Sequence, residues 1–140
     1  MAQGALTQLR ERFKNQIEFH HKDFPLRDVT AMAAEARRCA EKFDKKGQMH
    51  MLMLNGQRRW TLSQAPQNIW AKYARGVGAD MAEWRSCMSS GTFRSAVKSD
   101  KNLGLRMGVN STPTIFIGEK KLVGSVPFKA LAMAVRAQMN

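Results

Sequence analysis

Residues Gly108–Gly118 have the sequence GVNSTPTIFIG, and this stretch is the strongest indication of fold in the chain. A polar loop with an X-Pro bond at Pro113 leads directly into a short apolar segment. X-Pro bonds adopt the cis form at modest cost, and a cis proline usually sits in a tight turn. Gly108 is suited to end a helix in the left-handed conformation. Thr114–Ile117 predicts a buried strand, because β-branched and aromatic residues fill it and a glycine follows.

Two further elements are expected after this strand. Lys120–Val123 predicts a second strand. Leu131 and Val135 lie on the apolar side of an amphipathic pattern that predicts a C-terminal helix. The order in this part of the chain is therefore loop, strand, strand and helix.

A helix and a strand are expected before residue 26. Leu6, Leu9 and Phe13 recur at helical spacing with polar residues between them. Residues 16–21 then alternate between apolar and polar side chains up to His21, which predicts a strand. Pro25 ends it, because the residue before a proline avoids helical geometry.

The middle of the chain is expected to be a block of helices. Pro66 suits the first turn of a helix, where its missing N–H costs little. Asp80 with Glu83 resembles a capping box, which marks the start of another helix. The expected helical segments are 29–43, 49–54, one beginning at 66, one beginning at 80, and 93–108, with a turn at 56–59.

The order of loop, strand, strand and helix resembles the C-terminal half of a thioredoxin fold, and more closely its DsbA-like branch. Other stretches are similar to that family in the same order along the chain. They are Asp23-Phe24-Pro25-Leu26, Ala36-Arg37-Arg38-Cys39-Ala40 with Phe43, Gly78-Ala79-Asp80 with Trp84 and Cys87, and Asp100, Gly104 and Gly108-Val109.

The resemblance implies an α/β fold. It implies a single DsbA-like thioredoxin-fold domain over 1–140, with a helical insertion at 27–107 and thioredoxin core remnants at 1–26 and 108–140. The family's first strand is missing from this pattern, and it would lie between the strands near Phe19 and Phe116. Because unpaired strand edges invite pairing, we expect these two strands to pair directly or a second copy of the chain to fill the gap.

The chain departs from the family at the site of its chemistry. The family carries a Cys-x-x-Cys motif at the start of its first helix, whereas the two cysteines here are Cys39 and Cys87. The helix expected near Met1 places that motif upstream of the sequence. The chain is therefore interpreted as a fragment, a truncated gene product or a domain that has lost its active site. No catalytic residue is assigned, and we expect the chain as given to be inactive.

Two interpretations of the cysteines remain open. Cys39 lies on the apolar stripe of its helix and Cys87 one turn after Trp84, so both could be buried free thiols that behave as small hydrophobes. Some DsbA-like proteins carry a second cysteine pair at matching positions, so the resemblance also implies a structural disulfide. A catalytic role is disfavoured, because widely separated cysteines lack the neighbour that resolves a mixed disulfide.

The resemblance points to Ser111, Thr112 and Pro113 as peptide-binding residues. In the family, this loop lies against the Cys-x-x-Cys motif and offers backbone hydrogen bonds to an extended substrate peptide, a form of strand addition. The alternative is that Pro113 only shapes the turn, since a fold can keep its geometry without its chemistry.

The chain is strongly basic. It has 23 Lys and Arg residues against 11 Asp and Glu, a formal net charge of +12. This excess attracts polyanions non-specifically. The basic residues are scattered and form no recognised nucleic-acid motif. A basic nucleic-acid binder is therefore the least favoured function, and no specific nucleic acid is expected as a partner.

No metal and no cofactor are expected. His20 and His21 would point to opposite faces of a strand, and no Cys or His spacing, His50 included, matches a zinc site. No phosphate-binding loop or serine nucleophile motif is present. The methionines at 49, 51 and 53 could form a soft binding surface, but filling of the helical core is the favoured interpretation.

The resemblance implies a thiol:disulfide interchange domain that acts outside the cytoplasm, in the periplasm or an equivalent compartment. The alternative is a non-catalytic module that binds a peptide or a second copy. No apolar run approaches the ~20 residues of a transmembrane helix. Met1–Phe13 lacks a continuous apolar stretch and carries charges at Arg10, Glu11 and Arg12, so it does not resemble a secretory signal.

Overall fold

The computed structural model describes the backbone of residues 2–140 and the side chains of residues 4–140. The chain divides into two compact units. The first, here called the terminal unit, comprises Met1–His21 and Gly104–Asn140. The second, the helical unit, comprises Lys22–Leu103.

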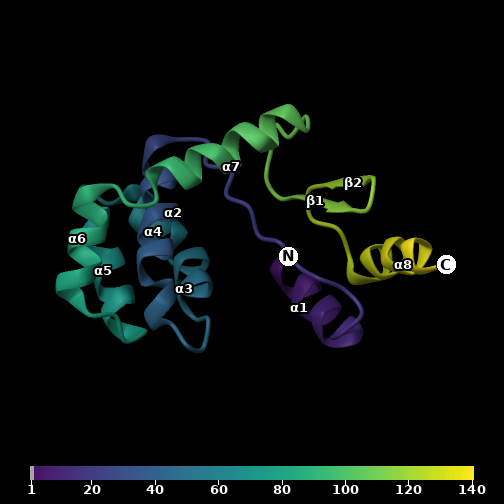
Figure 1. Ribbon diagram of the computed structural model, residues 1–140, viewed down its shortest axis with the longest axis horizontal. Coiled ribbons are helices and arrows are strands. Elements are labelled where there is room, and N and C mark those ends of the chain that lie inside the picture. The colour runs from purple at the N-terminus through teal and green to yellow at the C-terminus, as the bar shows by residue number, and fades with distance from the viewer. Residues whose placement is uncertain (1) are drawn as a thin grey trace. The chain divides into compact units, whose positions relative to one another are not determined.

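The helical unit consists of short helices joined by tight turns (Figure 1). Its elements are α2 (Asp28–Ala40), a 3₁₀ turn (Glu41–Phe43), α3 (Met49–Asn55), α4 (Gln57–Leu62), α5 (Pro66–Gly76), α6 (Met81–Ser90) and α7 (Arg94–Arg106), whose last residues belong to the terminal unit.

The predicted starts of two helices are confirmed. Pro66 occupies the first turn of α5. The Asp80 carboxylate accepts a hydrogen bond from the backbone N–H of Glu83 at 3.0 Å, so Asp80 caps α6. The turn expected at 56–59 is wrong, because α4 begins at Gln57 directly after Gly56. Trp60 explains the difference: its ring is buried, and its indole N–H donates to the carbonyl of Met53 at 2.9 Å.

Three tryptophans and the small residues of α2 form the core of the helical unit. Ala33, Ala36 and Ala40 are buried along one side of α2. They belong to the same cluster as Trp60, Trp70 and Trp84. Trp60 and Trp70 meet edge to face, with ring centroids 5.6 Å apart. Alanines on α2 leave room for these large rings to fill the interior at high density.

The terminal unit packs two helices and a hairpin around a second core. Its elements are α1 (Ala2–Phe13), β1 (Thr114–Ile117), β2 (Lys120–Val123) and α8 (Phe128–Met139). Leu9 and Phe13 of α1 and Leu131, Ala132 and Val135 of α8 are buried together. Ile115, Ile117 and Leu122 pack against them from one face of the hairpin. Both predicted strands and the C-terminal helix are confirmed.

The hairpin has an antiparallel register in which Ile117 pairs with Lys120 and Thr114 with Val123. A two-residue turn joins the strands, and Gly118 adopts a φ of 60° there, as such turns require. The backbone N–H of Gly124 donates to the carbonyl of Pro113 at 2.9 Å, which continues the ladder. Along an antiparallel ladder, residue pairs that are hydrogen-bonded to each other alternate with pairs that are not. The backbone groups of Thr114 and Phe116 therefore point away from β2.

The strand expected at 16–21 is wrong. Residues 17–25 form neither helix nor strand, and the sheet described in residues 2–140 consists of β1 and β2. Alternation makes a strand only where a neighbouring ladder accepts its hydrogen bonds. Ile17 and Phe19 instead pack against the core of the terminal unit, and the Arg10 guanidinium lies 4.6 Å from the Phe19 ring centroid. Direct pairing between this segment and β1 is therefore wrong as well.

Candidate functional site

The loop that precedes β1 is anchored at both ends. Gly108 follows α7 with a φ of 79°, and its carbonyl accepts from the Lys121 ammonium at 2.7 Å. The carbonyl of Ser111 accepts from the Thr114 hydroxyl at 2.7 Å. The Thr112–Pro113 peptide bond is cis. Thr112 is exposed, while Ser111 and Pro113 are half-buried.

An open strand edge continues this loop. Thr114 and Phe116 present their N–H and C=O groups on the side of β1 that faces away from β2, and no backbone partner for them occurs in the described part of the chain. A row of free donors and acceptors is the feature to which an added strand pairs. The loop and the edge together can therefore hold an extended segment by backbone hydrogen bonds.

The second candidate site is a disulfide between Cys39 and Cys87. The bond links α2 to α6 across 48 residues, with Cα atoms 5.9 Å apart. Cys39 is buried and Cys87 is half-buried. Both cysteines of the sequence are thus in this one bond. Neither has a second cysteine close to it in the sequence, as a Cys-x-x-Cys motif would provide.

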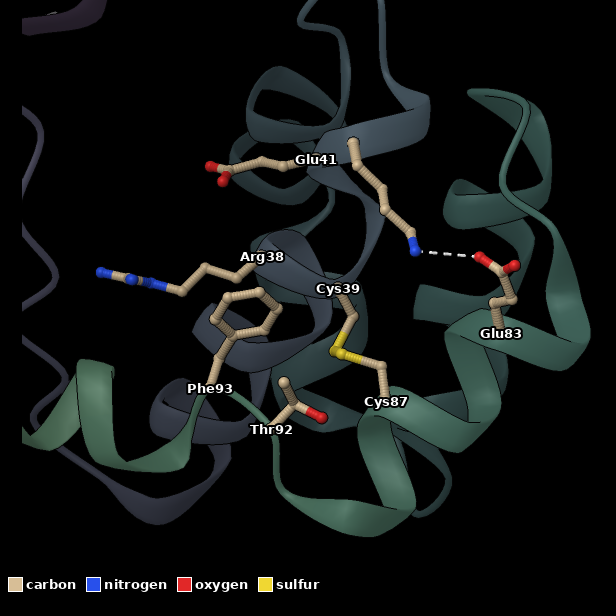
Figure 2. Close-up of a pocket in the computed structure, with 8 residues that line it drawn as sticks. Arg38, Cys39, Glu41, Glu83, Cys87, Thr92 and Phe93 are labelled. Carbon is tan, nitrogen blue, oxygen red and sulfur yellow. Dashed lines mark ion pairs between the residues drawn. A yellow bond between two sulfur atoms is a disulfide. The ribbon is translucent and has the colours of Figure 1, made fainter.

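A cavity of about 530 Å³ lies beside the disulfide (Figure 2). Two basic and two acidic residues contribute to its walls, so the cavity carries no excess of either charge. The Lys42 ammonium lies 2.9 Å from the Glu83 carboxylate, and this ion pair joins the 3₁₀ turn to α6. The lining residues are Arg38, Cys39, Glu41, Lys42, Glu83, Cys87, Thr92 and Phe93.

A buried charge cluster holds three segments of the helical unit together. The Asp23 carboxylate accepts from Nη2 of Arg37 at 2.8 and 2.9 Å and from Nε of Arg38 at 2.8 Å. Arg38 also donates to Asp100 at 2.7 Å, and the backbone N–H of Asp23 donates to the same Asp100 oxygen at 2.9 Å. The cluster therefore ties the segment before α2 to α2 and to α7.

The electrostatics of this cluster favour the charged form of Arg38. Burial opposes the charge on its guanidinium, yet the hydrogen bond to Asp23 and the attraction of Asp23 and Asp100 outweigh burial and raise the pKa of Arg38. Sequence patterns marked all four residues only as points of family resemblance. The contacts among these four residues were not predicted. Asp23 and Asp100 are far apart in the sequence, so no local pattern connects them.

The predicted site residues fall in different units. Ser111, Thr112 and Pro113 belong to the terminal unit, whereas Cys39 and Cys87 belong to the helical unit. In the described residues, no group of three or more His, Cys, Asp or Glu side chains could hold a metal ion. Met49 and Met53 fill the helical core, whereas Met51 is exposed.

The comparisons with known proteins agree with the resemblance at the level of the family. A family model described as thioredoxin matches residues 1–137, so the chain belongs to this thioredoxin family. No curated protein and no solved structure gives a significant match. The chain is thus a thioredoxin-like domain with mostly helical content and a small two-stranded sheet. Among the described helices, none is long and apolar enough to span a bilayer.

Proposed function

We propose that this chain is the peptide-binding body of a DsbA-like thiol:disulfide interchange protein. In this proposal, an extended segment of a substrate protein adds to the open edge of β1 beside Ser111, Thr112 and Pro113. The observation that carries the proposal is the row of backbone groups of Thr114 and Phe116 that point away from β2. Membership of the thioredoxin family supports the link to disulfide chemistry.

The edge is suited to this form of recognition. Main-chain hydrogen bonds supply affinity in strand addition, and they do not depend on the sequence of the added segment. Phe116 is 36% exposed and Val123 55% exposed, and by the alternation of side chains both lie on the face of the hairpin opposite the core. This face offers apolar contact to side chains of the added segment.

The redox step is assigned to a dithiol outside this sequence. Cys39 and Cys87 are bonded across the helical unit, and the chain contains no Cys-x-x-Cys motif. We therefore expect the chain as given to bind substrate without exchanging disulfides. A disulfide of this kind persists in oxidising compartments, which supports a periplasmic or other extracytoplasmic location.

A titration with an unfolded peptide tests the proposed edge. A ¹⁵N-labelled sample receives a cysteine-free, reduced and unfolded polypeptide, and the amide signals of the chain are followed by NMR. We expect saturable shifts at Thr114 and Phe116. Phe116→Pro removes one outward N–H and should abolish the shift of the Thr114 amide. The hairpin should persist in this variant, because proline fits an edge strand where its N–H faces solvent. Phe116→Ala keeps the N–H and loses only the apolar contact, so it should retain most of the binding.

Two results would count against the proposal. Equal binding by Phe116→Pro and Phe116→Ala would show that the edge is not used. Reduction of insulin by the chain alone would show that Cys39 and Cys87 act as a redox pair. The genomic reading frame upstream of Met1 gives a separate check, since an in-frame strand followed by Cys-x-x-Cys is expected there.

A second candidate function uses the same edge for self-association. In an antiparallel arrangement centred on Ile115, the outward groups of Thr114 would pair with those of Phe116 in a second copy. Unpaired edges of this kind favour such contacts. Sedimentation over a range of protein concentrations distinguishes the two, because self-association predicts a dimer that Phe116→Pro disrupts, whereas peptide binding predicts a monomer without ligand.

A further inference from the structure

Helices α3 and α4 are joined by the single residue Gly56, and both bury one side in the core of the helical unit. Met49 and Met53 are buried four residues apart on α3, and Trp60 is buried on α4. The Trp60 indole donates to the carbonyl of Met53, so the two buried sides meet. The opposite sides of the two helices therefore adjoin each other on the surface of this unit.

Large apolar side chains lie on that surface. Successive residues of a helix are about 100° apart, so the residues two before and two after Trp60 lie opposite its ring. The second of these, Leu62, is 75% exposed, more than any other large apolar side chain that the structure describes. Met51 and Leu54 of α3 are 40% and 41% exposed. The outer face, as we call this surface, consists of Met51, Leu54, Arg58, Arg59 and Leu62.

The charge of this part of the chain has one sign. Residues 45–79 contain six basic residues and no Asp or Glu. All six side chains are exposed, and none forms an ion pair with another described residue. The carboxylate of Asp44, just before this segment, caps α3 by accepting from the backbone N–H groups of Gln48 and Met49 at 2.9 and 2.7 Å. The six basic residues are Lys45, Lys46, Arg58, Arg59, Lys72 and Arg75.

This combination favours an anionic lipid bilayer as the partner. Basic side chains are attracted by the negative potential of such a surface. Exposed apolar side chains among them gain by entering the boundary between head groups and acyl chains. A nucleic acid would use the arginines through its phosphates, but its bases stack on aromatic side chains, which the outer face lacks. It would also leave Leu62 without an apolar contact.

From these observations, we propose that the outer face docks the helical unit onto a bilayer rich in anionic phospholipid. Arg58 and Arg59 lie against the lipid phosphates, to which guanidinium groups donate charge-assisted hydrogen bonds. Leu62, with its apolar neighbours on α3, enters the head-group boundary. The outer face shares no residue with the edge of β1, so the inference does not depend on the proposed function.

Vesicles of two compositions test the inference with the intact chain. Co-sedimentation is measured with phosphatidylcholine vesicles and with vesicles of phosphatidylcholine and phosphatidylglycerol in equal parts, at about 0.15 M salt. We expect saturable binding to the anionic vesicles and little binding to the neutral ones. A single-stranded oligonucleotide is titrated in parallel as a competing polyanion, and we expect it to bind more weakly than the anionic vesicles.

A pair of double variants tests the role of the arginines. Arg58→Gln/Arg59→Gln should weaken vesicle binding about thirtyfold, because each basic residue near the surface contributes a factor of about five. Lys120→Gln/Lys129→Gln is the control, since it removes the same charge from exposed positions of the terminal unit. Charges away from the contact are screened by salt, so the control should change binding by less than about twofold.

A second pair of variants tests the apolar contact. Leu62→Gln should weaken vesicle binding about tenfold, because the buried leucine surface is lost. Met133→Gln on α8 should leave binding unchanged, although Met133 is also exposed, at 61%. All of these variants replace exposed side chains, so they should fold, and circular dichroism with urea unfolding checks this.

Four results would overturn the inference. One is the absence of saturable binding to anionic vesicles. Another is an equal loss of binding in the two double variants, which would reduce the attraction to net charge. Equal binding by Leu62→Gln and Met133→Gln would show that Leu62 does not enter the bilayer. Tighter binding to the oligonucleotide than to the vesicles, lost in Arg58→Gln/Arg59→Gln, would assign the outer face to nucleic acid.

Discussion

Both carboxylate oxygens of Asp23 accept hydrogen bonds from Nη2 of Arg37, at 2.8 and 2.9 Å. The Asp23 side chain is 8% exposed and that of Arg37 is 11% exposed, so water screens this pair weakly. The contact fixes the segment before α2 to α2 itself, and Arg38 extends it to Asp100 on α7.

Removal of the Asp23 charge should destabilise the helical unit. Asp23→Asn leaves two buried guanidinium groups with incomplete partners, and loss of one partner of a buried ion pair typically costs about 3–5 kcal/mol. Unfolding in urea, followed by circular dichroism, measures the change in the free energy of unfolding. Glu41→Gln is the control, because the Glu41 side chain is 59% exposed and its pair with Arg37 should contribute less than about 1 kcal/mol. A similar loss in both variants would contradict a special role for the buried cluster.

The contribution of Arg38 to stability should persist at alkaline pH. Its pKa is raised in the folded state, so the contribution is present below the pKa of unfolded arginine and is lost only as pH rises through the folded value. Both values lie above the range in which proteins are handled. The difference in unfolding free energy between the wild type and Arg38→Met should therefore stay constant from about pH 7 to pH 10. A difference that shrinks over this range would contradict the raised pKa.

Loss of the disulfide should lower stability without changing the fold. A bond that closes a loop of 48 residues is expected to contribute about 4 kcal/mol through the entropy of the unfolded chain. The double variant Cys39→Ala/Cys87→Ala should unfold at a lower urea concentration by the corresponding amount. Wild-type protein treated with a reductant provides the control and should match the variant. No change on reduction would show that the bond does not form in solution.

Two tryptophans should respond differently to removal of their N–H groups. Trp84→Phe loses a buried hydrogen bond of 3.1 Å to the carbonyl of Ala36, and we expect a loss of about 1 kcal/mol beyond the cost of the smaller ring. Trp70→Phe loses a donor that has no described partner, so it should cost less. Thermal unfolding of both variants measures the difference, and the reverse order would be evidence against these assignments.

Two glycines of the terminal unit should give opposite effects when replaced by alanine. Gly118 has a φ of 60°, and an added Cβ would also meet the side chain of Gln138, so Gly118→Ala should cost about 1–2 kcal/mol. Gly4 lies inside α1 with open space around its Cβ position, so Gly4→Ala should stabilise the helix by up to about 1 kcal/mol. The free energies of unfolding in urea measure both. Destabilisation by both variants would contradict the placement of Gly4 in an exposed helical position.

Most of the secondary structure could be predicted from short-range patterns. The β1–β2 hairpin, α5 at Pro66 and α6 at Asp80 all depend on preferences of residues close in sequence. The loop at 111–113 could be found in the same way, because its composition is local. The predicted strand at 16–21 failed because its existence depends on a partner strand, and α4 was missed because burial of Trp60 outweighs the turn signal of Gly56.

The amino-acid sequence by itself determined where the backbone turns and which side of each helix is apolar, because these follow from φ preferences and periodicity within a few residues. Tertiary structure alone decided which distant groups meet. Asp23 and Asp100 are 77 residues apart, and the Cys39–Cys87 bond spans 48. Tertiary structure also decided that the Trp70 indole N–H has no partner among the described residues. It decided as well that residues 17–21 form no strand. Hydrogen bonds and ion pairs of this kind depend on distances in space, which no local pattern encodes.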